Sequence, residues 1–490
     1  METALHPNIR DFLVKPQPNV IGGQPRMTVT EQVMNPSDGS VLAEVAMGGA
    51  EEIDLAVAVG ERAFPSWSAL RPEDRAQLLH RFADALEKHS DELAQLESLD
   101  VGKPITAAEE FDIPFGIESF RYFTELSKQA HYNVPLHLKG LDARTWRAPY
   151  GVCGFIFPWN FPFTLLCWGI APALAAGNTV VVKPSEVTPL TTLYTAKIAE
   201  EAGLPAGVLN VVVGNGSEAG VALSSTPRIK RISFTGSPEV GRTVAELSGR
   251  NLVPCKLELG GKGAAVVFDD VDVDAVAIQL AAAITLNCGQ VCCTATRWII
   301  HEKVYDRFVD KVTSVLERTI IGPGLSRDTQ MGPLVSEAQR KRVLGYLERG
   351  KHNGARPIID GGVLSQPSYK EGFYVAPALL EGQDSNICCR EEIFGPCAYL
   401  LRFDDDASAI AKVNQLPYGL ANSVWSSNLD RANRVAERLL AGNSWINAHN
   451  LFAYGLPYGG INLSGMGGGV NSPDTFYDYL RSQTIARQLT

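Results

Sequence analysis

The pattern of hydrophobic positions alternates along the chain between short β-branched runs and longer helix-like stretches. Residues 179–182 form an apolar, β-branched run that is typical of a buried strand. The stretch from Pro189 to Ala202 predicts a helix that ends at Gly203. The same alternation continues through predicted strands at 208–213 and 230–234 and a predicted helix at 238–247. It predicts parallel strands that are joined by crossover helices.

A second set of alternating elements begins at Gly263. Its predicted strands are 264–268 and 297–300, and its predicted helices are 274–285, 304–319 and 337–350. Two successive sets predict an α/β protein with two doubly wound, Rossmann-like domains, each with a sheet between two layers of helices. We place the boundary between the two domains near residues 256–263.

Two segments belong to neither set. Residues 133–147 predict a β-hairpin with Gly140 near its turn, and residues 482–488 predict a short terminal strand. Exposed strands of this kind invite pairing with other chains unless they are covered. We therefore expect the two segments to form an edge that pairs with another subunit.

The length and composition limit the class of protein. A chain of 490 residues exceeds what one hydrophobic core normally organises, so two or three domains are expected. Hydrophobic residues make up 45% and charged residues 20%, which is ordinary for a globular chain in water. The net charge of -10 makes nucleic acid and anionic membranes poor partners.

Cysteine usage and the short apolar segments indicate the compartment. The nine cysteines are odd in number and several are adjacent, which favours a reducing environment over a disulfide framework. We expect no signal peptide in residues 1–14, and apolar stretches such as 165–176 are too short to cross a bilayer. The sequence therefore predicts a cytoplasmic protein with no membrane partner.

Three thiols lie close together in the segment 287–294, at Cys288, Cys292 and Cys293. A cysteine becomes a nucleophile only where its surroundings favour the thiolate near neutral pH. A zinc site is the alternative, but the spacing lacks a Cys-x-x-Cys pair and no histidine lies close by in the sequence. We therefore expect no metal, and a reactive thiol would need a base and an oxyanion donor from other segments.

Two polar residues in apolar surroundings are candidates for those roles. Glu258 stands between two leucines and before paired glycines, and burial there would raise its pKa and make it a base near neutral pH. It could instead pair with Lys256 or Lys262. Asn160 lies in the aromatic, proline-rich loop 157–162, where it either makes a structural hydrogen bond or donates to a developing alkoxide.

Three further segments are candidates for a nucleotide site. Ser237 is a suitable N-cap for a helix that follows a strand, and the free amides of such a helix can hold a phosphate. Lys183 and Glu186 lie just beyond another strand, and a carboxylate there accepts ribose hydroxyls and repels a 2′-phosphate. Glu392 could hold a ribose and Phe394 could flank a planar ring. Each segment taken singly could equally be a capped helix, a salt-bridge loop or a capped turn.

These segments together resemble the NAD(P)-dependent aldehyde dehydrogenase superfamily, over nearly the full length of the chain. In order, the matching motifs are Pro-Trp-Asn-Phe-Pro, Lys-Pro-Ser-Glu-x-Thr-Pro, Phe-Thr-Gly-Ser, Glu-Leu-Gly-Gly-Lys, Gly-Gln-x-Cys, Glu-Glu-Ile-Phe-Gly-Pro and Pro-Tyr-Gly-Gly-x-x-x-Ser-Gly. Each motif is modest alone, and their occurrence in family order leaves little room for chance.

The resemblance implies a role for each candidate. Cys292 matches the catalytic nucleophile because it ends the Gly-Gln-x-Cys motif. Asn160 matches the side-chain oxyanion donor that works beside the backbone amide of Cys292, and Glu258 matches the general base. The implied cofactor contacts are Trp159, Lys183, Glu186, Ser237, Glu392 and Phe394.

The implied reaction is oxidation of an aldehyde to the carboxylic acid with reduction of NAD⁺. It would proceed through a thiohemiacetal and then a thioester on Cys292, which water hydrolyses with Glu258 as the base. Because Glu186 would repel a 2′-phosphate, we expect NAD to be the preferred cofactor, and NADP is the second choice.

The resemblance also implies an arrangement of domains. Residues 1–130 and 149–257 would form the NAD-binding domain, and residues 258–465 the catalytic domain. Residues 131–148 and 471–490 would form an oligomerisation hairpin and strand. We therefore expect a homodimer or a homotetramer.

The substrate tunnel that motif position implies is mostly aromatic and apolar. Its expected wall residues are Leu165, Trp168, Phe452 and Tyr458, with His449 and Asn450 near its mouth. No arginine stands among them to hold a carboxylate, so an uncharged aliphatic or aromatic aldehyde is favoured. An aminoaldehyde or betaine-aldehyde-type substrate remains an alternative, because a cation could contact the face of Trp168.

Two other functions are alternatives. A coenzyme A-acylating dehydrogenase would pass the acyl group to a thiol, and Glu258 would then have no water to activate. A non-catalytic member of the family would be expected to lack the thiol or the base, and both are present.

Overall fold

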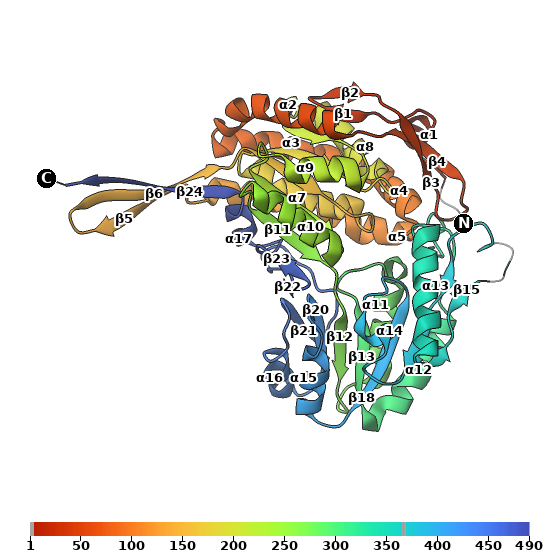
Figure 1. Cartoon of the computed structure of the whole chain (residues 1–490). Coiled ribbons are helices and arrows are strands. Elements are labelled where there is room, and N and C mark those ends of the chain that lie inside the picture. Colours follow the sequence, from red (N-terminus) through yellow and green to blue (C-terminus); the bar gives the residue numbers. More distant parts are fainter. Residues whose placement is uncertain (1–3, 365, 367–368, 490) are drawn as a thin grey trace.

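The computed structural model describes residues 4–364, 366 and 369–489. Figure 1 shows two α/β lobes and a narrow β arm that extends from the upper lobe. The upper lobe is built on a first sheet of eight strands in the order β2-β1-β9-β8-β7-β10-β11-β23. These strands are β1 (Asn19–Ile21), β2 (Gln24–Arg26), β7 (Val152–Ile156), β8 (Thr179–Lys183), β9 (Leu209–Val211), β10 (Arg231–Gly236), β11 (Cys255–Leu259) and β23 (Gly465–Met466). The five central strands, from β9 to β11, run parallel.

Helices cover both faces of the first sheet because its central strands are apolar on both sides. In β7, Cys153 and Phe155 belong to one core and Val152 and Ile156 to the other. The first core is completed by α3 (Pro72–Lys88), α4 (Ser90–Val101), α6 (Ile113–Gln129), α7 (Pro162–Ala175) and α8 (Leu190–Glu201), and the second by α2 (Ala50–Ser68) and α10 (Pro238–Arg250). The three layers expected for this part of the chain are therefore present.

The lower lobe contains a second sheet of seven strands in the order β14-β17-β18-β13-β12-β20-β21. The strands are β12 (Gly263–Val267), β13 (Ala295–His301), β14 (Arg356–Ile359), β17 (Ala378–Glu381), β18 (Cys397–Phe403), β20 (Ala421–Trp425) and β21 (Asn443–Ile446). All pairs are parallel except that of β14 with β17. One face packs on α11 (Val273–Thr285) and α12 (Tyr305–Glu317), and the other on α13 (Glu337–His352), α15 (Asp406–Asn414) and α16 (Leu429–Ala436). The predicted α/β class with two Rossmann-like sheets is confirmed.

The chain returns from the lower lobe to the first sheet through β23. Its two residues pair antiparallel with β11, placing Met466 opposite Leu257 and Gly465 opposite Glu258. Since β11 belongs to the first sheet, Glu258 does so too, and the second sheet begins only at Gly263. A strand of two residues has no periodicity, so the hydrophobic pattern gives no sign of this return.

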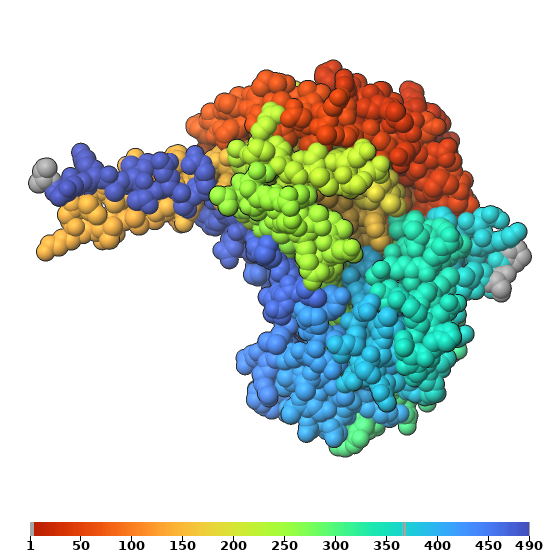
Figure 2. Space-filling view, viewed as in Figure 1, coloured from red at the N-terminus to blue at the C-terminus, as the bar shows by residue number. Residues whose placement is uncertain are grey.

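The arm consists of the hairpin β5 (Asn133–Leu138) and β6 (Leu141–Pro149) together with the terminal strand β24 (Leu480–Gln488). The hairpin and the terminal strand were both predicted, and β24 pairs antiparallel with β6 within one chain. Gly140 forms the turn with a φ of +76°, a conformation that favours glycine. In Figure 2 the arm stands away from the body of the molecule, and Trp146 is 41% exposed on it. Its pairing with another subunit remains a prediction.

Among the described residues, no helix has both the length and the apolar character that crossing a membrane requires.

Candidate active site

A cavity of about 460 Å³ is lined by residues of both lobes. The first sheet contributes residues at or just beyond the ends of β7, β10 and β11, among them Asn160, Ser237 and Glu258. From the second sheet the cavity receives residues that precede β13 and β18, among them Cys292 and Glu392. The cavity therefore lies at the carboxyl edge of the first sheet and the amino edge of the second.

Cys292 is the most accessible of the three clustered thiols. It is half-buried, whereas Cys288 and Cys293 are buried. Its Sγ lies 3.4 Å from the hydroxyl of Tyr458. Interaction with the Cys293 thiol, more than that with Tyr458, lowers the pKa of Cys292 despite burial, whereas burial raises the pKa of Cys288. The site therefore favours the thiolate more at Cys292 than at Cys288.

A strained turn presents Cys292 to the cavity. The φ angles of Asn287, Cys288 and Gly289 are +47°, +54° and +71°, and left-handed conformations are uncommon outside glycine. Gln290 holds this turn, because its Nε2 donates to Asn287 O at 3.0 Å and its Oε1 accepts from Val335 N at 3.0 Å. A Cβ on Gly289 would collide with the backbone of the segment before β18, so only glycine fits there.

Asn160 is buried and tied to the same turn. Its Nδ2 donates to Gln290 O at 3.0 Å, and its backbone oxygen accepts from Asn287 Nδ2 at 2.8 Å. A side-chain amide carries two hydrogens, so one remains to face the cavity that Asn160 lines. Asn160 can therefore fill both of its expected roles, because one hydrogen makes a structural bond and the other can donate to an oxyanion.

Glu258 lies in β11 with its carboxyl group in the cavity wall. Both carboxyl oxygens are buried and have no hydrogen-bond partner among the described residues. Burial raises the pKa of Glu258 well above its usual value, although Lys256 acts in the opposite direction. Lys256 pairs instead with Asp478 at 2.8 Å, so the expected alternative of a simple Glu258–Lys256 ion pair is not formed.

Two candidate cofactor residues face the cavity from the second lobe. Glu392 Oε1 accepts from Gly261 N at 2.9 Å, and burial raises the pKa of Glu392 to about 7. Phe394 has a φ of +62° and is held by Gln339, whose Nε2 donates to its backbone oxygen at 2.7 Å. A non-glycine residue in this conformation stores strain, and such residues cluster at functional sites.

The remaining cofactor candidates lie on the first sheet. Trp159 contacts Phe394 edge to face at 5.3 Å, and both residues line the cavity. Ser237 caps α10 by accepting from Val240 N at 3.3 Å. Lys183 is buried with its Nζ 3.3 Å from Glu186, and neither of these two lines the cavity itself.

The four predicted tunnel residues all line the cavity: Leu165, Trp168, Phe452 and Tyr458. The three aromatic rings pack together, with the centre of the Phe452 ring 5.3 Å from that of Tyr458 and 5.9 Å from that of Trp168. Asn450 also lines the cavity and accepts from the Cys293 thiol at 3.3 Å.

His449, expected near the tunnel mouth, bonds to the backbone beside Cys293. It does not line the cavity; its Nε2 lies 2.8 Å from Ala295 N and its Nδ1 lies 3.1 Å from Ser423 Oγ. Burial lowers the pKa of His449 to about 4, so its ring is neutral and can accept from Ala295. The histidine therefore anchors the backbone that follows Cys292.

The sequence did not predict several residues of the cavity wall, among them Phe111 and Arg342. Phe111 belongs to a π-helical turn, η1 (Ala108–Asp112), and its ring stacks on Phe115 at 5.1 Å. The only signal was the spacing of these two aromatic residues in a helical segment. Arg342 also lines the cavity, and its Nη2 donates to Glu392 O at 2.9 Å, so it lies on the side of the cofactor candidates.

No cluster of three or more potential metal ligands occurs among the residues that the structure describes. The zinc alternative for the thiols therefore has no ligand set in that part of the chain.

The fold and the site define an α/β enzyme with a thiol, an amide and a buried carboxyl group around one cavity beside a helix N-terminus. Comparison with known proteins gives the family. The sequence pattern described as the aldehyde dehydrogenase family matches residues 25–485. The chain belongs to the aldehyde dehydrogenase family, which confirms the resemblance of the motifs.

Relatives and solved structures match over most of their length. The chain is 39% identical to a benzaldehyde dehydrogenase, mitochondrial, of Antirrhinum majus, over 89% of this chain and 82% of that protein. It is 35% identical to an aldehyde dehydrogenase from Bacillus cereus solved as its NAD⁺ complex, with a TM-score of 0.97 and 100% of both chains covered. It is 31% identical to a betaine aldehyde dehydrogenase of Staphylococcus aureus solved with NAD⁺, with a TM-score of 0.95, covering 98% and 97% of the two chains.

Proposed function

We propose that this member of the aldehyde dehydrogenase family uses Cys292, Asn160 and Glu258 as its catalytic residues. The reaction is oxidation of an aldehyde to the carboxylic acid, with NAD as the cofactor. One observation carries the assignment: Cys292 combines a lowered pKa with partial exposure, and it shares a cavity with an amide donor and an unpartnered buried carboxyl group.

The geometry gives each of the three residues a task. The Cys292 thiolate adds to the aldehyde carbon, and the free Nδ2 hydrogen of Asn160 stabilises the oxygen as its charge develops. Loss of hydride from that carbon leaves a thioester on Cys292. Glu258, with its raised pKa, then takes a proton from water as the water attacks the thioester. The acid departs and the thiolate is restored.

The residues around the cavity are suited to a bound dinucleotide. At Gly260 the backbone lies close to the Glu392 carboxyl group, and a Cβ there would collide with it. The N-terminus of α10, capped by Ser237, offers free amides to a phosphate. Glu392, Trp159 and Phe394 would hold the nicotinamide half. When bound, NAD⁺ supplies the hydride acceptor.

We further propose that Lys183 and Glu186 contact the adenosine ribose. The carboxylate of Glu186 is accessible and would repel a 2′-phosphate, which supports NAD over NADP. The test is kcat/KM with each cofactor. A clear preference for NADP would contradict this role of Glu186.

The proposed substrate is an uncharged aliphatic or aromatic aldehyde. The wall formed by Trp168, Phe452 and Tyr458 is aromatic, and its rings offer contacts to another apolar or aromatic group. The similarity to a benzaldehyde dehydrogenase supports this choice, and that to a betaine aldehyde dehydrogenase keeps the cationic alternative open. Comparing benzaldehyde, hexanal and betaine aldehyde by kcat/KM decides between them; a large preference for betaine aldehyde would overturn the proposal.

The experiment that tests the catalytic assignment is the Cys292→Ala variant. It should lose aldehyde-dependent formation of NADH, whereas Cys255→Ser, which changes a half-buried thiol outside the cavity, should retain it. NADH formation by Cys292→Ala at the wild-type rate would refute the proposal. Adding coenzyme A to the wild type separates the acylating alternative, since a thioester product would then replace the free acid.

We propose the domain division 1–130 and 149–257 for NAD, 258–465 for catalysis, and 131–148 with 471–490 for assembly. The exposed side chains of Leu138, Trp146 and Ile485 on the arm support a homodimer or homotetramer. Sedimentation of the variant Trp146→Ser/Ile485→Ser should show smaller species than the wild type. An unchanged sedimentation coefficient would contradict the assembly role.

A cytoplasmic location is proposed because all nine cysteines are free. Non-reducing peptide mapping of protein isolated from its cells should find no disulfide, and a native disulfide would contradict the proposal.

A further inference from the structure

Helix α4 carries two buried carboxyl groups that the proposed reaction does not use. Glu97 and Asp100 are both 0% exposed and lie one turn apart on the same side of the helix. Glu97 Oε2 accepts from Phe163 N at 3.3 Å, and Asp100 Oδ2 accepts from Leu190 N at 2.8 Å. Each carboxyl group therefore binds the first turn of a different helix.

The two helices that receive these bonds have no side-chain cap of their own. Helix α7 begins at Pro162 and helix α8 at Leu190, and neither has a capping side chain at its N-terminus. A helix N-terminus carries free amides and partial positive charge, so a carboxyl group there is stabilising. Glu97 and Asp100 supply the missing caps from a third helix, which packs against α8 in the upper lobe (Figure 1).

Each capped helix follows a loop of the proposed site. Helix α7 comes directly after the loop that contains Asn160, and helix α8 comes directly after the loop that contains Glu186. The two loops are joined to each other, because Thr188 Oγ1 donates to Trp159 O at 3.0 Å. The orientation of both loops therefore depends on where α7 and α8 begin.

A buried ion cluster fixes Glu97 in turn. Lys103 Nζ lies 3.0 Å from Glu97 and 2.9 Å from Asp112, and it sits 4.1 Å from the centre of the Phe161 ring. Asp112 O accepts from Thr164 Oγ1 at 3.2 Å. Burying three charged groups is costly and is a poor way to gain stability, so a positioning role is the better account of the cluster.

We propose that α4 positions both halves of the active site, with Glu97 setting the loop of Asn160 and Asp100 setting the loop of Lys183 and Glu186. The two carboxyl groups act through other residues and touch neither substrate nor cofactor. The inference rests on the proposed roles of Asn160 and Glu186. It predicts that two substitutions on one helix affect two different kinetic constants.

The experiment compares Glu97→Ala with Asp100→Ala in the full-length protein. Removal of Glu97 leaves Lys103 paired with Asp112, so the cluster stays charge-balanced. Glu97→Ala should lower kcat by about tenfold to a hundredfold, because small misplacements of a catalytic group have effects of that size, and leave KM for NAD⁺ within about twofold. Asp100→Ala should raise KM and Kd for NAD⁺ by about tenfold, the effect of losing roughly 1.4 kcal/mol of binding, with kcat nearly unchanged.

A matched control lies on the same helix. Glu92 accepts from Asn8 Nδ2 at 3.2 Å and belongs to the end of α4 that faces α1 (Pro7–Leu13). Glu92→Ala should change neither constant. The conservative variant Asp100→Asn keeps an acceptor oxygen and should restore most of the NAD⁺ affinity, since asparagine caps as well as aspartate. If Glu97→Ala fails to fold, Glu97→Asp keeps the charge and withdraws the oxygen from Phe163, and it should lower kcat alone.

A double-mutant cycle separates this inference from the proposed function. In an Asn160→Ala background, Glu97→Ala should produce no further loss of kcat, because it acts only through Asn160. If Asn160→Ala alone kept the full kcat, the proposed oxyanion role of Asn160 would be refuted. A low kcat in Asn160→Ala with an undiminished further loss from Glu97→Ala would overturn the positioning role and leave the proposed function standing. Equal effects of Glu97→Ala and Asp100→Ala on both constants would also overturn it.

Discussion

The two sheets have the same kind of architecture and use opposite edges. In open α/β sheets, ligands usually bind beyond the carboxyl ends of the strands. The first sheet follows this rule, since Asn160, Ser237 and Glu258 stand at or beyond those ends. The second sheet contributes Cys292 and Glu392 from its amino edge.

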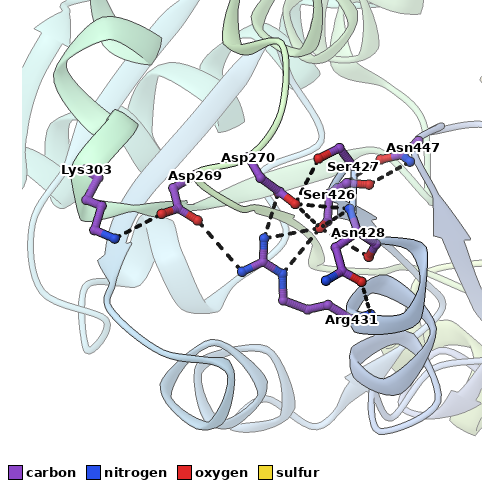
Figure 3. Close-up of polar contacts among 8 residues, drawn as sticks. All are labelled: Asp269, Asp270, Lys303, Ser426, Ser427, Asn428, Arg431 and Asn447. Carbon is purple, nitrogen blue, oxygen red and sulfur yellow. Dashed lines mark hydrogen bonds and ion pairs between the residues drawn. The ribbon is translucent and has the colours of Figure 1, made fainter.

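At the carboxyl edge of the second sheet the polar groups bond to one another, as Figure 3 shows, and we call this edge closed because its groups are not free for a ligand. Asp270 follows β12 and accepts from Ser426 Oγ at 2.9 Å, Ser427 Oγ at 3.0 Å and Asn428 N at 3.0 Å, all beyond β20. Arg431 Nη2 lies 2.7 Å from the same carboxylate. By contrast, the oxygens of Glu258 have no partner on the edge that faces the cavity. A carboxyl edge becomes a site only where its polar groups are left free to meet a ligand.

The largest effect on catalysis should come from removing the unpartnered carboxyl group of Glu258. Glu258→Gln should lower kcat by about a hundredfold or more, because general base catalysis is worth that much, while Cys292 still forms the thioester. Intact-mass measurement after mixing with aldehyde and NAD⁺ should show the acyl adduct accumulating. The control is Glu381→Gln, which changes a carboxyl group of β17 that accepts from Tyr305 outside the cavity. Rapid turnover without an adduct would contradict the role of Glu258.

Removal of the Asp270 carboxylate should instead lower the stability and leave catalysis unchanged. Asp270→Ala loses several charge-assisted hydrogen bonds and should lower the free energy of unfolding by about 2 kcal/mol. Neither kcat nor KM should change by more than about twofold, because the network lies on the far edge of the sheet from Cys292. Thermal unfolding and steady-state assays on one preparation provide the comparison. A large fall in kcat with unchanged stability would show that this edge is functional.

The same residue gives a pH test of the contrast. Burial opposes ionisation of Asp270, but the hydrogen bonds from Ser426, Ser427 and Asn428 prevail and lower its pKa. Its stabilising contribution is therefore present above the pKa of the unfolded state, about 4, and is lost as the pH falls through the lower folded value. The difference in unfolding free energy between wild type and Asp270→Ala should shrink below about pH 4.

The sequence predicted the elements whose patterns are local. Apolar runs such as that of β8 and helices such as α10 were recognised because their periodicity lies within a few residues. The two-residue strand β23 has no such pattern, although it pairs with β11 beside Glu258 and so ends the first sheet. Cys292 was separated from Cys288 and Cys293 only by its motif. Its pKa is lowered mainly by the adjacent Cys293 thiol and in addition by Tyr458, whose contact with Cys292 no local pattern contains.

A smaller effect is expected at Glu392, on the amino edge of the second sheet. Burial raises its pKa to about 7, so the carboxylate that would accept ribose hydroxyls forms only as the pH rises through that value. The Kd for NAD⁺ should therefore rise by up to about tenfold between pH 8 and pH 6. Glu392→Gln should bind weakly at both pH values, and the neighbouring variant Glu391→Gln should keep the wild-type dependence. Direct binding is the measurement, because kcat also reflects the Cys292 thiolate. A flat wild-type profile would contradict the role.

The smallest effect should come from Asp269, the neighbour of Asp270 in the closed network. Its carboxylate lies 3.1 Å from Lys303, whose side chain is 69% exposed, and 3.8 Å from Arg431. Ion pairs at such exposed positions contribute little, so Asp269→Asn should lower the free energy of unfolding by less than about 1 kcal/mol and leave kcat unchanged. Urea unfolding of Asp269→Asn beside Asp270→Ala measures the difference. Equal destabilisation by both would mean that charge rather than hydrogen bonding closes this edge, and the effect would then fall with added salt because exposed pairs are screened.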